Sequence, residues 1–264
     1  MKLLTINTHS LLEAEFDKKA DIFADAVAEE LPDVIALQEV NQSAAADIRD
    51  CPFEICGYKT RVDNYAAVLL DKLGKRSVKY YGIWLPVKRG YERYDEGLAV
   101  FSRFPVLETS NILVSEHDDY SDWRTRRALG IRNEFGWFYS VHMGWWNDEK
   151  EPFESQWRRL EKPLTGKERV WLMGDFNNRA DIENEGYTLV IKSGWHDAYR
   201  LAKNKDCGFT VDKKIDGWKE TQKMRIDYIF SNFKAEIEKS QVIFNGENRD
   251  IVSDHYGVMI ETKE

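Results

Sequence analysis

Two patterns of hydrophobic residues divide the chain into expected helices and strands. Between Phe16 and Leu31 the apolar residues recur at helical spacing and Pro32 stops the pattern, so we predict a helix there. Residues 33–40 and 169–174 are instead short apolar runs without alternation, which is typical of strands covered on both faces. Together, the two patterns indicate a layered α/β fold.

The same criteria locate the other elements. Strands are expected at 2–7, 33–40, 97–103, 127–133, 137–142, 169–174, 225–231, near 237–244 and at 256–262, and helices at 16–31, 64–73, 153–164 and near 186–192. Because some strands are joined by short loops and others by helices, we predict mixed sheets with helices outside them. No repeat, low-complexity segment or flexible linker interrupts the sequence, so residues 1–264 are expected to form a single domain.

The charge and composition of the chain argue against two classes of binding partner, nucleic acids and membranes. The 38 basic and 46 acidic residues give a formal net charge of −8. A surface that follows duplex DNA needs many clustered Lys and Arg, so this balance argues against nucleic acid, although one or two local arginines could hold a small phosphate. No run of about 18 apolar residues is present, and a membrane partner is therefore not expected.

The N-terminus and the cysteines indicate a compartment. The first residues form too short an apolar stretch for a signal peptide and lack a small-residue cleavage site. Cys51, Cys56 and Cys207 match neither a zinc spacing nor a disulfide framework. We therefore expect reduced thiols and a cytoplasmic protein.

Polar side chains stand where the predicted strands begin or end. In α/β sheets, ligands bind where strands end, and residues two apart on extended backbone face the same way. Five segments can therefore direct their side chains to one place, namely Asn7, Glu39, His142, Asp175, Asn177, Asp254 and His255. Each of these groups could instead serve only as a turn, a helix cap or a solvated strand end.

Asp227 differs because it lies within the apolar run RIDYIF. A lone buried carboxylate costs several kcal/mol unless it is paired. It could form a salt bridge with Arg225 or a lysine, or it could orient the imidazole of His255. Three of the five histidines, His9, His142 and His255, fall at strand edges, and that coincidence favours a functional site.

The chemistry that these residues support is hydrolysis of a phosphate ester with a hard divalent metal. Glu39 suits an oxygen-preferring ion such as Mg²⁺, with Mn²⁺ as a substitute, and Asn7 could bind the metal or the attacking water. Asp175 could orient or deprotonate that water while Asn177 donates to the phosphoryl group. An imidazolium at His142 or His255 would stabilise the charge of the transition state.

Seven motifs in order, INTH, LQEV, EGLAVFSR, SVHM, GDFN, RIDYIF and SDH, resemble the endonuclease/exonuclease/phosphatase superfamily, also called DNase I-like. They run from residue 6 to residue 255, nearly the whole chain. The resemblance implies a four-layer sandwich of two mixed β-sheets flanked by helices. It also implies a magnesium-dependent hydrolase of phosphoric esters.

The resemblance assigns roles to individual residues. It implies metal-site residues Asn7, Glu39 and Asp254, catalytic residues His142, Asp175, Asn177, Asp227 and His255, a glutamate, Glu96, beside the first histidine, and a phosphate-contacting Arg127. His9 is a departure, since many endonucleases of the family have Asp at that position. This weakens a close assignment to the abasic-site branch.

Aromatic residues near these motifs bear on the substrate. Trp145 and Trp146 follow His142 almost directly, and flat indole faces suit the apolar face of a sugar ring. They could also stack on bases, and most of the nine tryptophans are expected to be packing residues. Candidates to hold the phosphate are Arg124, Arg126 and Arg127.

The stretches KLLTINTHS, DNYA, YDEGLAVFSRFP, YSVHMGWW and VWLMGDFN are similar to cytoplasmic phosphatases of low-GC Gram-positive bacteria that act on maltose 6'-phosphate. A metal-dependent phosphomonoesterase with a small-molecule sugar phosphate as its partner is therefore expected. The alternatives are a nuclease or other phosphodiesterase of the same superfamily, and a binding module without catalytic activity.

Overall fold

A computed structural model describes residues 1–55, 57–215, 217–218 and 222–263. Within them the strands form two mixed sheets. The first has the order β10 (Asn204–Lys205), β12 (Ile237–Ile243), β13 (Gly257–Thr262), β1 (Lys2–Asn7), β2 (Val34–Ser43), β4 (Tyr94–Ser102) and β3 (Tyr81–Gly90). The second has the order β5 (Glu108–Leu113), β6 (Arg127–Asn133), β7 (Gly136–His142), β8 (Val170–Asp175), β11 (Asp227–Ser231) and β9 (His196–Asp197).

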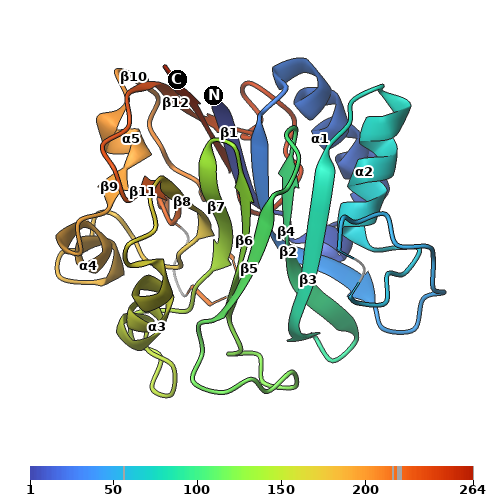
Figure 1. Cartoon of the computed structure of the whole chain (residues 1–264), viewed down its shortest axis with the longest axis horizontal. Coiled ribbons are helices and arrows are strands. Elements are labelled where there is room, and N and C mark those ends of the chain that lie inside the picture. Colours follow the sequence, from blue (N-terminus) through green and yellow to red (C-terminus); the bar gives the residue numbers. More distant parts are fainter. Residues whose placement is uncertain (56, 216, 219–221, 264) are drawn as a thin grey trace.

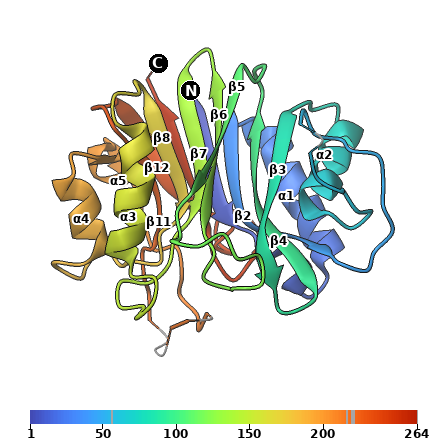
Figure 2. The same ribbon diagram turned by 60° about the horizontal axis from the view of Figure 1, so that its bottom comes forward.

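Helices cover the outer faces of the two sheets. They are α1 (Phe16–Glu30), α2 (Tyr65–Lys75), α3 (Phe153–Glu161), α4 (Gly186–Lys192) and α5 (Ala198–Leu201), with short 3-10 turns at Ser10–Leu12 and Lys162–Leu164. In Figures 1 and 2, α1 and α2 lie on one side of the strands and α3 and α4 on the other. The predicted four-layer sandwich is therefore confirmed.

The strand sequences explain the layers, because successive side chains on a strand point to opposite faces. On β7, Phe138 enters the core between the two sheets, whereas Tyr139 enters the core under α3. On β1, Leu3 faces the second sheet and Leu4 faces α1 and α2. Runs such as VWLMG are apolar at every position because both faces of their strand are buried.

Most predicted elements are present, and the edge strands are the main omission. No strand was predicted at β3, where Pro86 interrupts the run. Proline cannot donate to a strand ladder, but β3 is the last strand of its sheet, where this is tolerated. The other edge strands, β5, β9 and β10, were also missed. The helix predicted to end before Gly74 continues to Lys75.

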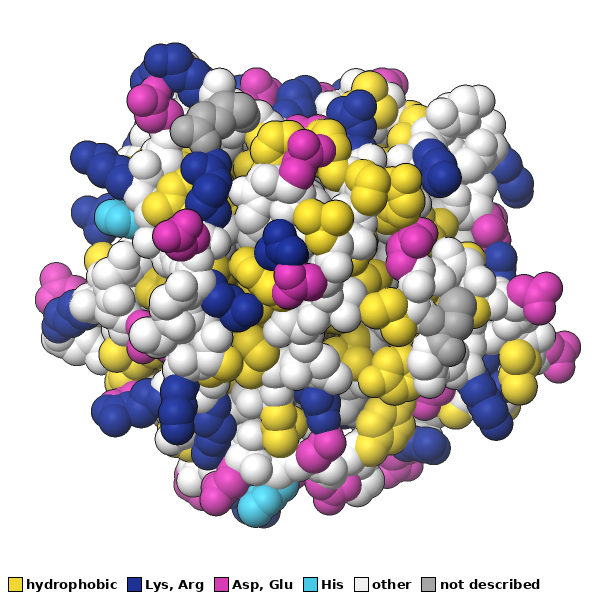
Figure 3. All heavy atoms as spheres, viewed as in Figure 1, with side chains coloured by type: hydrophobic (Ala, Val, Ile, Leu, Met, Phe, Trp, Pro, Cys, Tyr) yellow, Lys and Arg dark blue, Asp and Glu magenta, His cyan; other side chains and the backbone are white. Residues whose placement is uncertain are grey.

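The expectation of reduced thiols is wrong for Cys51, which takes part in a disulfide. Cys207 is free and exposed, and Cys56 lies outside the described residues. No helix in the described part of the chain combines the length and apolarity that crossing a membrane would require. On the face shown in Figure 3, basic and acidic side chains are interspersed, so this face concentrates neither sign of charge.

Candidate active site

The strand ends meet at a cleft of about 270 Å³ at one rim of the sandwich. Its wall contains Glu39 of β2, His142 of β7, Asp175 of β8, and Asp254 and His255 from the segment before β13. β1 runs parallel to β2, and β7 runs parallel to β8, so each pair of strands ends at the same rim. Strand pairing therefore brings together side chains that lie far apart in the sequence.

Glu39 reaches the cleft because β2 is irregular there. The pairing of β2 with β4 shifts register between Leu37 and Val40, and Glu39 has a φ of +51°. A bulge of this kind re-aims the side chains around it, and a positive φ at a non-glycine residue is a strained conformation that often marks a functional site. Gln38 points between the sheets and donates to Ser140 Oγ at 2.9 Å, while Glu39 points into the cleft.

Asp175 is the centre of a hydrogen-bonded network. Its Oδ1 accepts from the backbone N–H of Asn177 at 2.8 Å, and its Oδ2 accepts from Asn7 Nδ2 at 3.2 Å. The same Oδ2 lies 3.7 Å from His142 Nε2 and 3.8 Å from His255 Nε2. Asn177 has a φ of +48°, so the chain turns sharply after the strand and returns an N–H to this carboxylate.

Asp227 orients His255 and does not pair with Arg225. His255 Nδ1 lies 3.0 Å from Asp227 Oδ2 and 3.2 Å from its Oδ1, which leaves Nε2 directed toward Asp175. The guanidinium of Arg225 instead bonds Asp197 at 2.7 Å. Asp175, Asp227 and His255 offer ligand atoms within 4.8 Å of one another, a buried cluster consistent with a metal site.

The two histidines of the cleft have opposite charge preferences. Burial lowers the pKa of His255, but Asp227 and Asp175 outweigh it and hold that pKa well above its usual value. Burial, and then Arg126, lowers the pKa of His142 well below its usual value. Burial, followed by repulsion from Asp227, raises the pKa of Asp175 to about 7. At neutral pH His255 is therefore an imidazolium and His142 a neutral imidazole.

The cleft is rich in the oxygen donors that a hard cation prefers. Asn7 Nδ2 donates to Glu39 Oε1 at 2.9 Å, so its amide lies beside that carboxylate. Burial, followed by Glu96 and Asp254, raises the pKa of Glu39. A divalent cation among crowded carboxylates offsets their mutual repulsion, and Mg²⁺ binds carboxylate and carbonyl oxygens. Asn7, Glu39 and Asp254 therefore fit such an ion.

His9 brings a positive charge to the edge of this donor set. Its Nδ1 lies 2.7 Å from Glu13 Oε1 and 3.9 Å from Asp254 Oδ1. Burial lowers the pKa of His9, but Glu13, Asp254 and Glu39 outweigh it and raise that pKa to about 9. The residue that departs from the family pattern is thus protonated at neutral pH. Glu13 carried no signal in the sequence, because no motif includes it.

Two buried cations also line the cleft. Arg126 is 3% exposed and Lys88 is 6% exposed. Lys88 Nζ lies 3.2 Å from Glu96 Oε1 and donates to the carbonyl oxygen of Trp123 at 2.9 Å. Among the described residues Arg126 Nε has no hydrogen-bond partner, and a buried donor left in that condition costs free energy that a bound anion would recover. Lys88 was missed because it lies on the unpredicted strand β3.

Arg124 and Arg127, which the sequence analysis grouped with Arg126, lie outside the wall of the cleft. Arg127 begins β6 and donates to Asn111 Oδ1 at 2.8 Å. Arg127 instead lines a much smaller cavity, of about 10 Å³, together with Arg126 and His142. Arg124 pairs with Asp148 at 3.1 Å. The expected phosphate contacts of Arg124 and Arg127 stay predictions.

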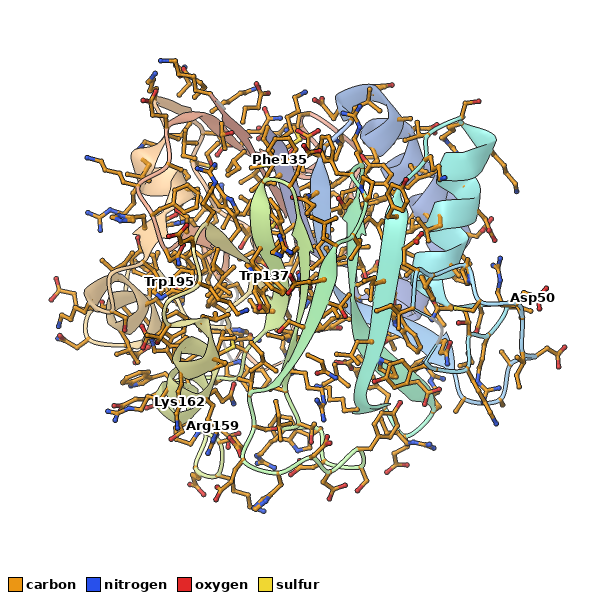
Figure 4. The ribbon with its side chains drawn as sticks, in the orientation of Figure 1. Asp50, Phe135, Trp137, Arg159, Lys162 and Trp195 are labelled. Carbon is orange, nitrogen blue, oxygen red and sulfur yellow. The ribbon has the colours of Figure 1, made fainter. Side chains whose placement is uncertain are left out.

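The tryptophans fall into two groups. Five are buried in the cores, namely Trp84, Trp137, Trp157, Trp171 and Trp195. Figure 4 labels Trp137 and Trp195, which belong to the core under α3 and α4. Of the others, Trp123 and Trp145 line the cleft, and with Trp146 and Trp218 they line a neighbouring cavity. Trp146 therefore lies beside the expected sugar position but outside the cleft itself.

Comparison with known proteins agrees with this arrangement. The model of the endonuclease/exonuclease/phosphatase family matches residues 4–255. The chain belongs to this family. It is accordingly a phosphoester hydrolase. Among curated protein sequences, none matches the chain significantly.

Solved structures of family members resemble the protein over its full length. An endonuclease/exonuclease/phosphatase family protein from Leptotrichia buccalis is 36% identical, with a TM-score of 0.90 and 100% of both chains covered. A mannosyl-6-phosphatase from Bacteroides thetaiotaomicron is 18% identical, with a TM-score of 0.68 and 100% of both chains covered. A 3' phosphatase from Neisseria, bound to a product DNA hairpin, has the same identity, TM-score and coverage.

Proposed function

We propose that this family member is a magnesium-dependent phosphomonoesterase that releases phosphate from a sugar phosphate, with maltose 6'-phosphate as the first candidate. The observation that carries the proposal is the pair of buried cations, Arg126 and Lys88, beside Asp175 and His255 in one small cleft. A phosphate monoester carries close to two negative charges at neutral pH. A phosphate diester carries one negative charge, so two buried cations bind the monoester more strongly than the diester.

The sugar is inferred from the aromatic border of the cleft. Trp123 and Trp145 line it, and flat indole faces suit the apolar face of a pyranose ring. The mannosyl-6-phosphatase of Bacteroides thetaiotaomicron supports a sugar phosphate as a substrate class for this fold. Maltose 6'-phosphate rests on the sequence resemblance alone. With that substrate, delivered by a sugar transport system, the proposed compartment is the cytoplasm.

Each residue of the site then has a chemical task. Bound at Asn7, Glu39 and Asp254, Mg²⁺ would neutralise negative charge on the phosphoryl oxygens. Asp175, with its raised pKa, orients the attacking water and accepts its proton near neutral pH. His255, held by Asp227, donates a hydrogen bond from Nε2 to the developing phosphorane.

The remaining groups position the substrate. Arg126 donates to a phosphoryl oxygen through the Nε that lacks a partner. The side-chain amide of Asn177 donates one hydrogen bond to the carbonyl oxygen of Met143 at 3.0 Å. Asn177 also forms part of the wall of the cleft. Neutral His142 supplies a second imidazole beside Asp175 without adding positive charge.

A substrate panel tests the proposal. With Mg²⁺, the protein is expected to release phosphate from sugar 6-phosphates and to leave plasmid DNA intact. The measurements are inorganic phosphate release and plasmid nicking on a gel. Rapid nicking without phosphate release from any sugar phosphate would instead favour the nuclease alternative. Efficient release only from 3'-phosphorylated DNA would favour a role like that of the Neisseria enzyme.

Neighbouring arginines provide a second prediction. Arg126→Met is expected to lower kcat/KM by roughly 10- to 100-fold, because a hydrogen bond to a charged group contributes about 1.5–3 kcal/mol. Arg127→Met, which removes a cation one residue away but outside the cleft, is expected to change kcat/KM by less than about twofold, as exposed ion pairs contribute little. Steady-state kinetics measure kcat/KM, and a melting curve shows whether each variant is folded. A larger loss of kcat/KM in Arg127→Met than in Arg126→Met would contradict the assignment of Arg126 to the phosphate.

A further inference from the structure

A second cavity adjoins the active-site cleft. Its volume is about 700 Å³, and its wall includes Trp123, Trp145, Trp146 and Trp218. Trp123 and Trp145 line both the cleft and this cavity, which we call the tryptophan cavity. The two spaces are thus neighbours that share an aromatic wall.

The shared wall is built to hold its indoles in place. The rings of Trp123 and Trp145 lie 5.8 Å apart at 60°. The guanidinium of Arg124 lies 4.1 Å from the centre of the Trp123 ring and is itself bonded to Asp148 at 3.1 Å. On Trp145, a Cβ added to Gly217 would lie only 2.2 Å from the indole Cζ2, so the backbone packs directly on the ring.

Part of this aromatic surface is exposed to solvent. Trp123 is 45% exposed, although it is fixed by Arg124 and Trp145. A large, ordered apolar ring that faces solvent at the mouth of a cleft marks a ligand-binding surface. Asp148, Arg179 and Glu185 line the same cavity and place charged groups around it, as a ligand with many hydroxyl groups requires.

The sizes of the two spaces are informative. Pockets for drug-sized ligands measure about 300–1,000 Å³, so a cleft of about 270 Å³ suits a phosphoryl group with one sugar ring at most. A longer substrate must extend beyond the cleft, and the tryptophan cavity is contiguous with it through Trp123 and Trp145.

We infer that the tryptophan cavity binds the sugar ring remote from the phosphate, so that the enzyme prefers disaccharide phosphates to monosaccharide phosphates. Trp146 and Trp218 contact that second ring, and Arg124 is a positioning residue that acts through Trp123. The inference rests on the proposed function.

The test compares two substrates in matched variants. The wild-type protein is expected to hydrolyse maltose 6'-phosphate with a kcat/KM at least about tenfold above that for glucose 6-phosphate, because only the disaccharide phosphate has a second ring to contact the tryptophan cavity. Trp146→Ala is expected to remove most of this preference by lowering kcat/KM for the disaccharide phosphate alone. Because Trp146 is partly buried, the conservative Trp146→Phe serves as a further variant.

Phe135→Ala is the control. Phe135 is 37% exposed in the turn between β6 and β7, at the end of β7 opposite His142 (Figure 4), and its loss is expected to leave both substrates unchanged. A binding measurement complements the kinetics: maltose should inhibit glucose 6-phosphate hydrolysis by the wild type and not by Trp146→Ala.

The possible outcomes separate the two proposals. If wild-type protein hydrolyses neither sugar phosphate, the proposed function fails. If it hydrolyses both equally, or if Trp146→Ala lowers both to the same extent, the tryptophan cavity is not a second-ring site although the proposed function stands. A preference for 3'-phosphorylated single-stranded DNA that Trp146→Ala abolishes would assign the cavity to a base and overturn the inference.

Discussion

Asp175→Asn is expected to lower kcat for phosphate release by about 1,000-fold or more while the protein stays folded. Asparagine has nearly the same shape, and its amide oxygen can still accept from the backbone N–H of Asn177, although its NH2 group cannot accept from Asn7 as the carboxylate does. It cannot accept a proton from water. It also removes the repulsion between Asp175 and Asp227, so the melting temperature should be unchanged or higher.

Asp71→Asn is the matched control for that experiment. Asp71 is exposed, pairs with Arg49 at the surface and does not line the cleft, so kcat should stay within about twofold of the wild-type value. Phosphate release under saturating substrate gives kcat, and circular dichroism reports folding. Retention of full activity by Asp175→Asn would show that another group handles the attacking water.

Removal of divalent cations is expected to reduce phosphate release to the uncatalysed background, and added Mg²⁺ to restore it. The reason is electrostatic: Glu39, Glu96 and Asp254 crowd negative charge into one cleft, and burial prevents water from screening it. The measurement is activity after dialysis against EDTA, followed by titration with Mg²⁺. Mn²⁺, which also accepts oxygen ligands, is expected to substitute.

Glu39→Gln refines this prediction with a readout other than activity. Saturating Mg²⁺ is expected to raise the melting temperature of the wild-type protein by about 5 °C, because a ligand that binds only the folded state stabilises it. The shift should be much smaller in Glu39→Gln and unchanged in Glu108→Gln, whose carboxylate pairs with Arg132 at the surface. Full activity in protein shown by elemental analysis to be metal-free would contradict the metal requirement.

Several site residues could be predicted from the apolar residues next to them in the sequence. The apolar run before Asp175 is a strand buried on both faces, and a strand of this kind that ends in GDFN presents a carboxylate at a sheet rim. The position of Asp227 within an apolar run likewise required a partner, and His255 supplies it at 3.0 Å. In both cases an unpaired buried carboxylate would cost free energy, so the sequence indicates that the side chain has a partner or a ligand.

Other site residues carried no such signal. Lys88 follows a proline on an edge strand, where the usual strand pattern is broken. The resemblance singled out Arg127 as a phosphate contact, yet of Arg124, Arg126 and Arg127 only Arg126 lines the cleft, because the local path of the chain sets which side chain enters it. The disulfide of Cys51 was also not foreseen, since spacing between cysteines does not specify which of them approach each other.

The order of apolar runs and polar strand ends by itself determined the layered α/β fold and most of the residues that surround the cleft, because hydrophobic burial sets which segments become strands. Only the tertiary structure decided which arginine faces the cleft, which histidine is charged, and that Lys88 and Glu13 join the site. Those properties depend on side-chain direction, on burial and on charges contributed by distant segments, and no local stretch of sequence contains them.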